Sequence, residues 1–292
     1  MIEKYGLLLA KLSDDRTSGA EQLVASALDI IRMAVGDEGV SDNELANILD
    51  EIVGIIRTKF NELAPMSGLA TSISALSRDN LRESAGELER ELRKKIAMES
   101  LSLARIGANL IPQNSTVTTI SHSETVLNVL SKTKGLARDF HVIAAISEPS
   151  GEGRITAKSL ADMGIDVTLV PDGAIGYAVE RSNIVVVGAD AVAGEFFINK
   201  IGTFPMALAA KHFNVPFYVC ARLDKFTPSR NLPKSRRVFG PEELKPPESK
   251  LITAQAPLFE RIPLSLVEGI VTESGIVKPH GNRIEIPEIA DA

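Results

Sequence analysis

Three polar side chains follow a short apolar run near the middle of the chain. The run at 184–187 predicts a buried strand, Asp190 comes just after it, and Asn199 and Lys200 precede a predicted helix at 203–213. Open α/β sheets carry their ligand sites in the loops that follow the carboxyl ends of the strands. A carboxylate there can bind a hydroxyl or exchange a proton, and a lysine beside a helix start can face an anion. We expect a ligand site here, and the alternative is a packed strand and helix with solvated charges.

Other polar side chains follow two further predicted strands. Ser121 and His122 come directly after the strand at 116–120, and Asp172 comes shortly after the strand at 167–170. Parallel strands present their carboxyl ends at one edge of the sheet, so these side chains are expected on the same side as the first site. Two carboxylates near one crevice would suit a polyol or a sugar phosphate.

A second candidate site lies at the start of a predicted helix near the N-terminus. Arg16, Thr17, Ser18 and Gly19 combine a cation, two hydroxyls and backbone amides at a helix start. Such a group can hold a phosphate. The alternative is an ordinary N-cap by Thr17 or Ser18 with Arg16 in solvent.

No metal or cofactor is expected. The four histidines lack metal-ligand spacing, and neither a Rossmann glycine fingerprint nor a phosphate-binding loop is present. The chain has a single cysteine, Cys220, so it cannot form an intrachain disulfide, which is consistent with a reducing cytoplasm. Cys220 ends a predicted strand, and we expect its side chain to be buried in the core.

Composition narrows the class of protein. The chain has 292 residues and a formal net charge of −6, which argues against direct nucleic-acid binding because phosphate neutralisation needs a basic face. Its apolar runs fall short of the ~18 residues that cross a bilayer, and its first residues do not resemble a secretory signal. We expect a cytoplasmic protein with no membrane contact.

The hydrophobic pattern divides the chain into two predicted domains. Residues 1–112 show helical spacing, including a capping box that begins at Ser41, whereas 113–292 alternate short β-branched runs with helices. We therefore predict an α/β protein: a helical N-terminal domain followed by a Rossmann-like domain with a mainly parallel sheet. The basic, proline-rich segment 228–250 is expected to be a surface loop or arm. The remaining strands are expected at 141–146 and 217–220, and helices at 123–134, 155–163 and 175–179.

Five motifs resemble one superfamily and occur in its order. They are DRTSGA, GADAV, INKIGT, VPFYVCARLDKF and IVTESGIVKP, beginning at residues 15, 188, 198, 215 and 270. Together they resemble the regulatory alpha, beta and delta subunits of translation initiation factor 2B and the related ribose-1,5-bisphosphate and methylthioribose-1-phosphate isomerases. The resemblance covers almost the whole chain.

The resemblance implies a fold, a site and partners. It implies a ligand pocket between the two domains and a homodimer or larger homo-oligomer formed mainly through the C-terminal domain. The isomerases use a cysteine together with the aspartate of the G-A-D motif, which is Asp190 here, while Asn199 and Lys200 match an N-K pair. The implied partners are translation initiation factor 2 and, in the pocket, a sugar phosphate or a nucleoside monophosphate.

Three positions depart from the isomerase pattern. Ser121 stands where the isomerases have the cysteine, Glu148 stands where an arginine precedes a proline, and Glu260 replaces an aspartate. A serine hydroxyl, unlike a tunable thiol, needs a partner base to take up a proton. We therefore expect a non-catalytic regulatory or scaffold protein with a ligand-sensing pocket. The alternative is a ribose-1,5-bisphosphate isomerase that uses Asp190, with Ser121 or His122 as the second acid/base group.

Overall fold

The computed structural model describes residues 3–15, 18–61, 63–232 and 238–285. The chain forms two compact units that divide between Glu99 and Ser100, and we describe each unit by itself. The division falls inside a long helix that the sequence pattern placed wholly in the helical domain. Among the described residues, no helix combines the length and the apolar character needed to cross a membrane.

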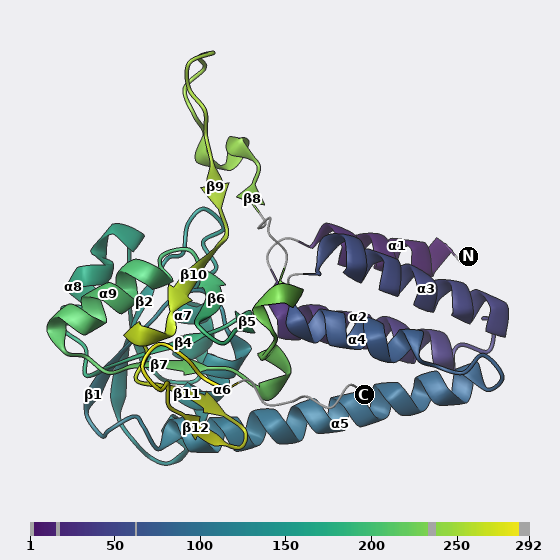
Figure 1. Ribbon diagram of the computed structural model, residues 1–292, viewed down its shortest axis with the longest axis horizontal. Helices are drawn as coiled ribbons and strands as arrows, with labels where there is room; N and C mark the ends of the chain where they lie inside the picture. The colour runs from purple at the N-terminus through teal and green to yellow at the C-terminus, as the bar shows by residue number, and fades with distance from the viewer. Residues whose placement is uncertain (1–2, 16–17, 62, 233–237, 286–292) are drawn as a thin grey trace. The chain divides into compact units, whose positions relative to one another are not determined.

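The first unit is helical (Figure 1). Its core consists of apolar side chains at helical spacing, with Tyr5, Leu23, Leu45 and Phe60 almost fully buried. The capping box predicted at Ser41 is confirmed, because Ser41 accepts from the backbone of Glu44 and the Glu44 carboxylate accepts from the backbone of Ser41. The helices are α1 (Glu3–Asp14), α2 (Ala20–Gly36), α3 (Asp42–Lys59), α4 (Ala64–Ser74) and α5 (Leu81–Ala108), the last of which continues into the second unit.

The second unit is built on a seven-stranded sheet in the order β12-β11-β7-β4-β1-β2-β3. All neighbouring pairs are parallel except β11 and β12. The predicted mainly parallel sheet is therefore confirmed. Its strands are β1 (Ser115–Thr119), β2 (Phe140–Ala145), β3 (Asp166–Val170), β4 (Ile184–Gly188), β7 (Phe217–Cys220), β11 (Gly269–Thr272) and β12 (Gly275–Val277).

Helices cover both faces of this sheet. Side chains alternate along β4, so Val185 and Val187 pack in the cluster that includes Ile175 of α8 and Met206 of α9. Ile184 and Val186 of the same strand pack in the opposite cluster, which contains apolar side chains of α6 and α7. The central strands are thus buried on both faces, which is why they are continuous apolar runs. The helices are α6 (Glu124–Gly135), α7 (Gly153–Asp162), α8 (Ile175–Glu180) and α9 (Thr203–Phe213).

The strands predicted from the sequence for β1, β2, β3, β4 and β7 agree with the structure to within one residue at either end. The prediction of an irregular loop between β4 and α9 is wrong. It contains β5 (Ala191–Val192) and β6 (Phe196–Lys200), which pair antiparallel, and β6 also pairs with β10 (Phe259–Pro263). The pairing of β6 with β10 joins distant segments, so local pattern alone did not indicate it.

Residues 238–257 project from the sheet as an arm (Figure 1). The arm contains a two-stranded ribbon of β8 (Val238–Phe239) and β9 (Ala256–Pro257), and Leu251, which lies between these strands in the sequence, is 95% exposed. Most of the described residues between 241 and 255 are exposed, as expected of a surface arm. Short 3-10 helices lie at Asp172–Ala174, Leu223–Lys225, Ser229–Asn231, Pro241–Leu244 and Leu264–Leu266.

Candidate functional site

The candidate site lies at the carboxyl ends of β1 and β4, which are neighbours in the sheet. The strand order runs from β1 through β2 to β3 on one side and from β4 through β7 to β11 on the other, so the topology reverses between β1 and β4. Open α/β sheets bind ligands at such a switch point. Ser121 follows the end of β1 and Asp190 follows the end of β4, so the topology places both beside this point. Asp190 is partly exposed, and its backbone N–H donates to the carbonyl of Ile198 at 2.9 Å.

Ser121 has a left-handed backbone conformation that is uncommon for a residue with a side chain. Its φ is 69°, and Ser147, which follows β2, has a φ of 68°. The Ser121 N–H donates to the Ser147 hydroxyl at 2.8 Å, and the Thr156 hydroxyl donates to the Ser121 carbonyl at 2.8 Å. Strained conformations of this kind persist where surrounding contacts hold them, and they concentrate at functional sites. These bonds fix the direction in which the Ser121 side chain points.

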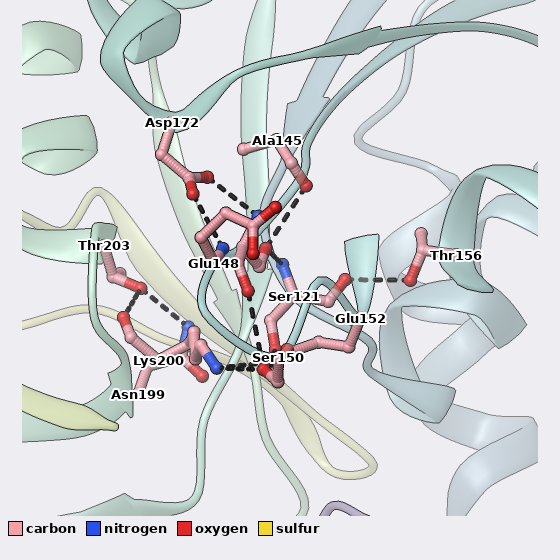
Figure 2. A network of polar contacts seen from close by, with 11 residues as sticks. Ser121, Ala145, Glu148, Ser150, Glu152, Thr156, Asp172, Asn199, Lys200 and Thr203 are labelled. Atoms are coloured by element: carbon pink, nitrogen blue, oxygen red, sulfur yellow. Dashed lines mark hydrogen bonds and ion pairs between the residues drawn. The ribbon is translucent and has the colours of Figure 1, made fainter. Parts of the chain in front are cut away.

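The side chains of Ser121, Ser150, Glu152 and Lys200 form one polar cluster, shown in Figure 2, in which Glu152 and Lys200 are buried and the two serines are partly buried; we call it the Glu152 cluster. Ser121 Oγ donates to Glu152 Oε1 at 3.0 Å, and Lys200 Nζ lies 2.7 Å from the same oxygen. Lys200 also donates to Ser150 Oγ at 2.7 Å, and Ser150 donates to Glu152 Oε2. The side chains of Lys200 and Glu152 are only 3% and 9% exposed. A buried ion pair survives when further hydrogen bonds satisfy its atoms, and the two serines supply them.

Gly153 explains how Glu152 reaches the end of β1. Helix α7 begins at Gly153, whose N–H donates to the carbonyl of Ile146 at 2.9 Å. A Cβ at this position would lie 1.8 Å from the carbonyl oxygen of Ala145, so only glycine permits this approach. The close contact between the helix start and the end of β2 brings Glu152, the residue before Gly153, up to Ser121.

Asp172 holds the loop after β2. Its two carboxylate oxygens accept from the backbone N–H groups of Ser147 and Glu148, at 2.8 and 2.7 Å. Glu148 forms an ion pair with Arg154 at 2.9 Å, and both side chains are about half exposed, so this pair contributes little stability. The negative charge of Glu148 is thus paired with the positive charge of Arg154. The carboxylate of Asp172 binds the protein backbone.

Asn199 and Lys200 lie on β6 and are buried, at 6% and 3% exposure. Asn199 Nδ2 donates to Thr203 Oγ1 at 3.0 Å, and that hydroxyl donates to the carbonyl of Lys200 at 2.6 Å. These bonds link the end of β6 to the first residue of α9 (Figure 2). The amide of Asn199 therefore fixes the strand that carries Lys200.

The N-terminus of α9 faces a carboxylate of the protein itself. Glu260 Oε1 accepts from the N–H groups of Gly202 and Phe204, at 2.7 and 2.8 Å. Gly202, with a φ of 99°, forms the N-cap. Amides at a helix start favour an anion, and Glu260 supplies it here. The anion expected at this helix start is thus a side chain from β10.

His122 and Cys220 have different surroundings. His122 Nδ1 lies 3.0 Å from Thr156 Oγ1, and His122 Nε2 lies 3.2 Å from Glu124 Oε1. Cys220 is fully buried, and that burial raises the pKa of its thiol to about 12. The thiol is therefore protonated at neutral pH and remote from solvent, so it cannot serve as the proton-accepting cysteine of an isomerase.

The remaining sequence-derived candidates lie at the start of α2. Arg16 and Thr17 fall outside the described residues. Gly19 is the N-cap of α2, and the Ser18 N–H donates to Asp15 Oδ1 at 2.8 Å. This segment belongs to the helical unit.

The structure therefore brings Ser121 and Lys200 into one cluster. Sequence reasoning missed Glu152, which joins them, and Ser150, and it named Glu260 only as a departure from the isomerase pattern. The available signal was the pair of glycines in SEPSGEG, at 151 and 153, where the chain turns tightly and approaches a strand. Among the described residues, no group of three or more histidine, cysteine, aspartate or glutamate side chains could hold a metal ion. The arrangement can bind hydroxyl groups and move protons.

Two sugar-phosphate isomerases are similar in sequence to this chain. The chain is 33% identical over 214 residues to ribose 1,5-bisphosphate isomerase of Methanocaldococcus jannaschii, which covers 72% of this chain and 70% of that protein. It is also 33% identical over 218 residues to methylthioribose-1-phosphate isomerase 2 of Pseudothermotoga lettingae, covering 68% of this chain and 62% of that protein.

A solved structure matches the whole fold. The crystal structure of translation initiation factor eIF-2B from Pyrococcus horikoshii OT3 has a TM-score of 0.80 at 26% identity, covering 96% of this chain and 98% of that chain. The model of the initiation factor 2 subunit family matches residues 16–279, a span that includes every strand of the seven-stranded sheet. The chain therefore belongs to the initiation factor 2 subunit family.

Proposed function

We propose that this protein is an aldose–ketose isomerase of a ribose phosphate, with ribose 1,5-bisphosphate as the first candidate substrate. The observation that carries the proposal is the pairing of Ser121 and Asp190 at adjacent strand ends on the switch point of the sheet, with the Ser121 hydroxyl bonded to a buried carboxylate. The similarity to ribose 1,5-bisphosphate isomerase over 72% of the chain supports the choice of substrate.

Aldose–ketose conversion needs two proton-handling groups. One removes a proton from C2, the hydroxyl-bearing carbon beside the phosphorylated C1, and returns it to C1, while the other protonates the ring oxygen that C1 releases and takes up the proton of the C2 hydroxyl. Asp190 is the group we assign to the oxygen, because it is partly exposed at the end of β4. The group that handles the carbon-bound proton lies on the Ser121 side.

The test is direct turnover. Purified protein is incubated with ribose 1,5-bisphosphate, and ribulose 1,5-bisphosphate is followed by NMR, with methylthioribose 1-phosphate as a second substrate. Asp190→Asn removes the proton-exchanging carboxylate at nearly constant volume, so kcat is expected to fall by about 10²-fold or more. Absence of turnover of both substrates by the unaltered protein would refute the proposal.

A regulatory, non-catalytic role is the second candidate. It is favoured by the serine at position 121, where the isomerases have a cysteine, and by the similarity to translation initiation factor eIF-2B across 96% of the chain. In this role the same pocket would bind a sugar phosphate or a nucleoside monophosphate as a signal, and the protein would act in the cytoplasm as a homo-oligomer.

Two measurements separate this role from catalysis. Light scattering gives the oligomeric state, and co-purification tests contact with translation initiation factor 2. Calorimetric titration with sugar phosphates and nucleoside monophosphates, repeated with Lys200→Ala, tests the pocket. Binding of a sugar phosphate without turnover, together with retention of the factor, would favour the regulatory role over the isomerase.

A further inference from the structure

An isomerase with this sequence lacks the thiol that its relatives would use. Ser121 occupies the cysteine position, and the one cysteine of the chain, Cys220, is fully buried in strand β7. A serine hydroxyl is a poor proton acceptor on its own and needs an adjacent base. The isomerase activity proposed above therefore requires a base that lies beside Ser121 in space.

We propose that Glu152 is that base: it accepts the Ser121 proton while Ser121 takes up the proton of the substrate carbon, so that a Ser121–Glu152 relay replaces the cysteine. This inference rests on the proposed isomerase function. Ser121 Oγ already donates to Glu152 Oε1 at 3.0 Å, which leaves the lone pairs of Oγ as the acceptor (Figure 2). Because Glu152 acts through Ser121, it is a positioning residue, and it holds the Ser121 hydroxyl proton until the proton returns to Oγ.

The proton transfers balance at each step. The substrate C–H bond breaks, its proton bonds to Ser121 Oγ, and the original hydroxyl proton passes to Glu152 Oε1. The electron pair of the broken bond forms the C1–C2 double bond of an enol phosphate as the bond between C1 and the ring oxygen breaks, and protonated Asp190 gives its proton to that ring oxygen. Ser121 then delivers its proton to C1, and Glu152 returns its proton to Oγ. Asp190 regains a proton from the C2 hydroxyl, which becomes the ketone, so no outside reactant is needed.

The surroundings of Glu152 suit this role. Lys200 Nζ lies 2.7 Å from Glu152 Oε1 and is almost fully buried, so the ammonium charge remains beside the site when the carboxylate becomes neutral. That charge then faces the negative charge that develops on the substrate, and its effect is strong because water is largely excluded. Ser150, bonded to both Lys200 and Glu152, keeps the two groups in place.

Other neighbouring acid/base groups are engaged elsewhere. Asp172 accepts two backbone N–H groups of the loop after β2, and Glu260 accepts two at the start of α9. His122 contacts Thr156 and Glu124 through its two ring nitrogens. Among the described residues, the carboxylate that accepts the hydrogen bond of the Ser121 hydroxyl is that of Glu152.

The experiment measures kcat and KM for ribose 1,5-bisphosphate in four variants. Ser121→Ala and Glu152→Gln each break the relay, so kcat is expected to fall by about 10²-fold or more, with KM changed by less than about threefold. The double variant Ser121→Cys with Glu152→Gln is expected to recover turnover to within about tenfold of the unaltered protein, because a thiol does not need the carboxylate. Glu180→Gln, an exposed carboxylate at the end of α8, is the matched control.

The outcomes separate this inference from the isomerase function. If the unaltered protein turns over but Glu152→Gln keeps its kcat, or the thiol fails to rescue it, the relay is refuted and the isomerase stands. If the unaltered protein turns over neither ribose 1,5-bisphosphate nor methylthioribose 1-phosphate, both are refuted. Thermal melting checks folding, and should Glu152→Gln not fold, Ser121→Ala decides, because it leaves the Glu152–Lys200 ion pair intact. Retained kcat in that variant refutes the relay.

Discussion

Replacing Lys200 with methionine tests the physical basis of the Glu152 cluster. The substitution keeps the length and most of the volume of the side chain but removes the ammonium that lies 2.7 Å from Glu152 Oε1. Among the described residues, Glu152 then remains buried with the two serine hydroxyls as its only side-chain partners. A carboxylate in that position is either charged without compensation or protonated, and both states cost free energy.

The expected loss of stability is large. The two side chains are 3% and 9% exposed, so solvent screens the pair weakly. Breaking a buried ion pair by removing one partner costs about 3–5 kcal/mol. For a unit of this size each kcal/mol lowers the melting temperature by about 2–4 °C, which gives a decrease of about 6–20 °C. Lys158→Met, which breaks an exposed pair with Asp162, is expected to cost about 0–1 kcal/mol.

The assay is thermal and urea unfolding followed by circular dichroism. Adding Glu152→Gln to Lys200→Met removes the uncompensated negative charge of Glu152, so the double variant is expected to be more stable than Lys200→Met alone. If Lys200→Met melts within about 1 °C of the unaltered protein, as expected for an exposed pair, the buried ion pair is not stabilising the unit and the reasoning is wrong.

Three other predictions concern the approach of α7 to the sheet, the buried thiol and the helical unit. Gly153→Ala places a Cβ 1.8 Å from the Ala145 carbonyl oxygen and is expected to cost about 1–3 kcal/mol or more in urea unfolding, whereas Gly176→Ala, with open space around it, should not destabilise. Burial raises the Cys220 pKa from 9.0 to about 12, so the folded thiol should resist a disulfide reagent at pH 8. Because the folded state holds this proton more tightly, its contribution to stability is complete below pH 9.0 and is lost as the pH rises toward 12; a Cys220→Ala variant that loses the same stability over this range would contradict the assignment. Tyr5→Phe removes the hydrogen bond that most lowers the pKa of Asp37, so NMR titration should find the pKa of Asp37 higher in the variant, and an unchanged value would show that the bond is absent in solution.

Much of the fold could be predicted because its signals are local. The continuous apolar run of β4 indicated a strand buried on both faces, and the S-x-x-E pattern at Ser41 indicated a helix start. The strand β6 was not predicted, since it is stabilised by pairing with β10, which lies far along the chain. Its short sequence carries polar Asn199 and Lys200, which local pattern assigned to a loop.

The candidate site was predicted only in part, and for the same reason. Strand ends followed by polar residues indicated Ser121 and Asp190, and the order of strands in the sheet made their ends neighbours. Glu152 gave no such signal, because a glutamate before a helix is an ordinary N-terminal residue. Its importance arises from the close approach allowed by Gly153.

By itself, the sequence determined the parallel α/β architecture, the edge of the sheet that carries the polar residues, and the presence of a serine at position 121, where the resemblance to the isomerases leads us to expect a cysteine. Tertiary structure alone decided that Ser121 meets the buried ion pair of Glu152 and Lys200 in one cluster. The physical reason is that hydrophobic periodicity specifies which face of each element is buried, but an ion pair depends on distances between side chains from separate elements. Those distances are set by strand order, by the pairing of β6 with β10, and by the packing of α7 against β2.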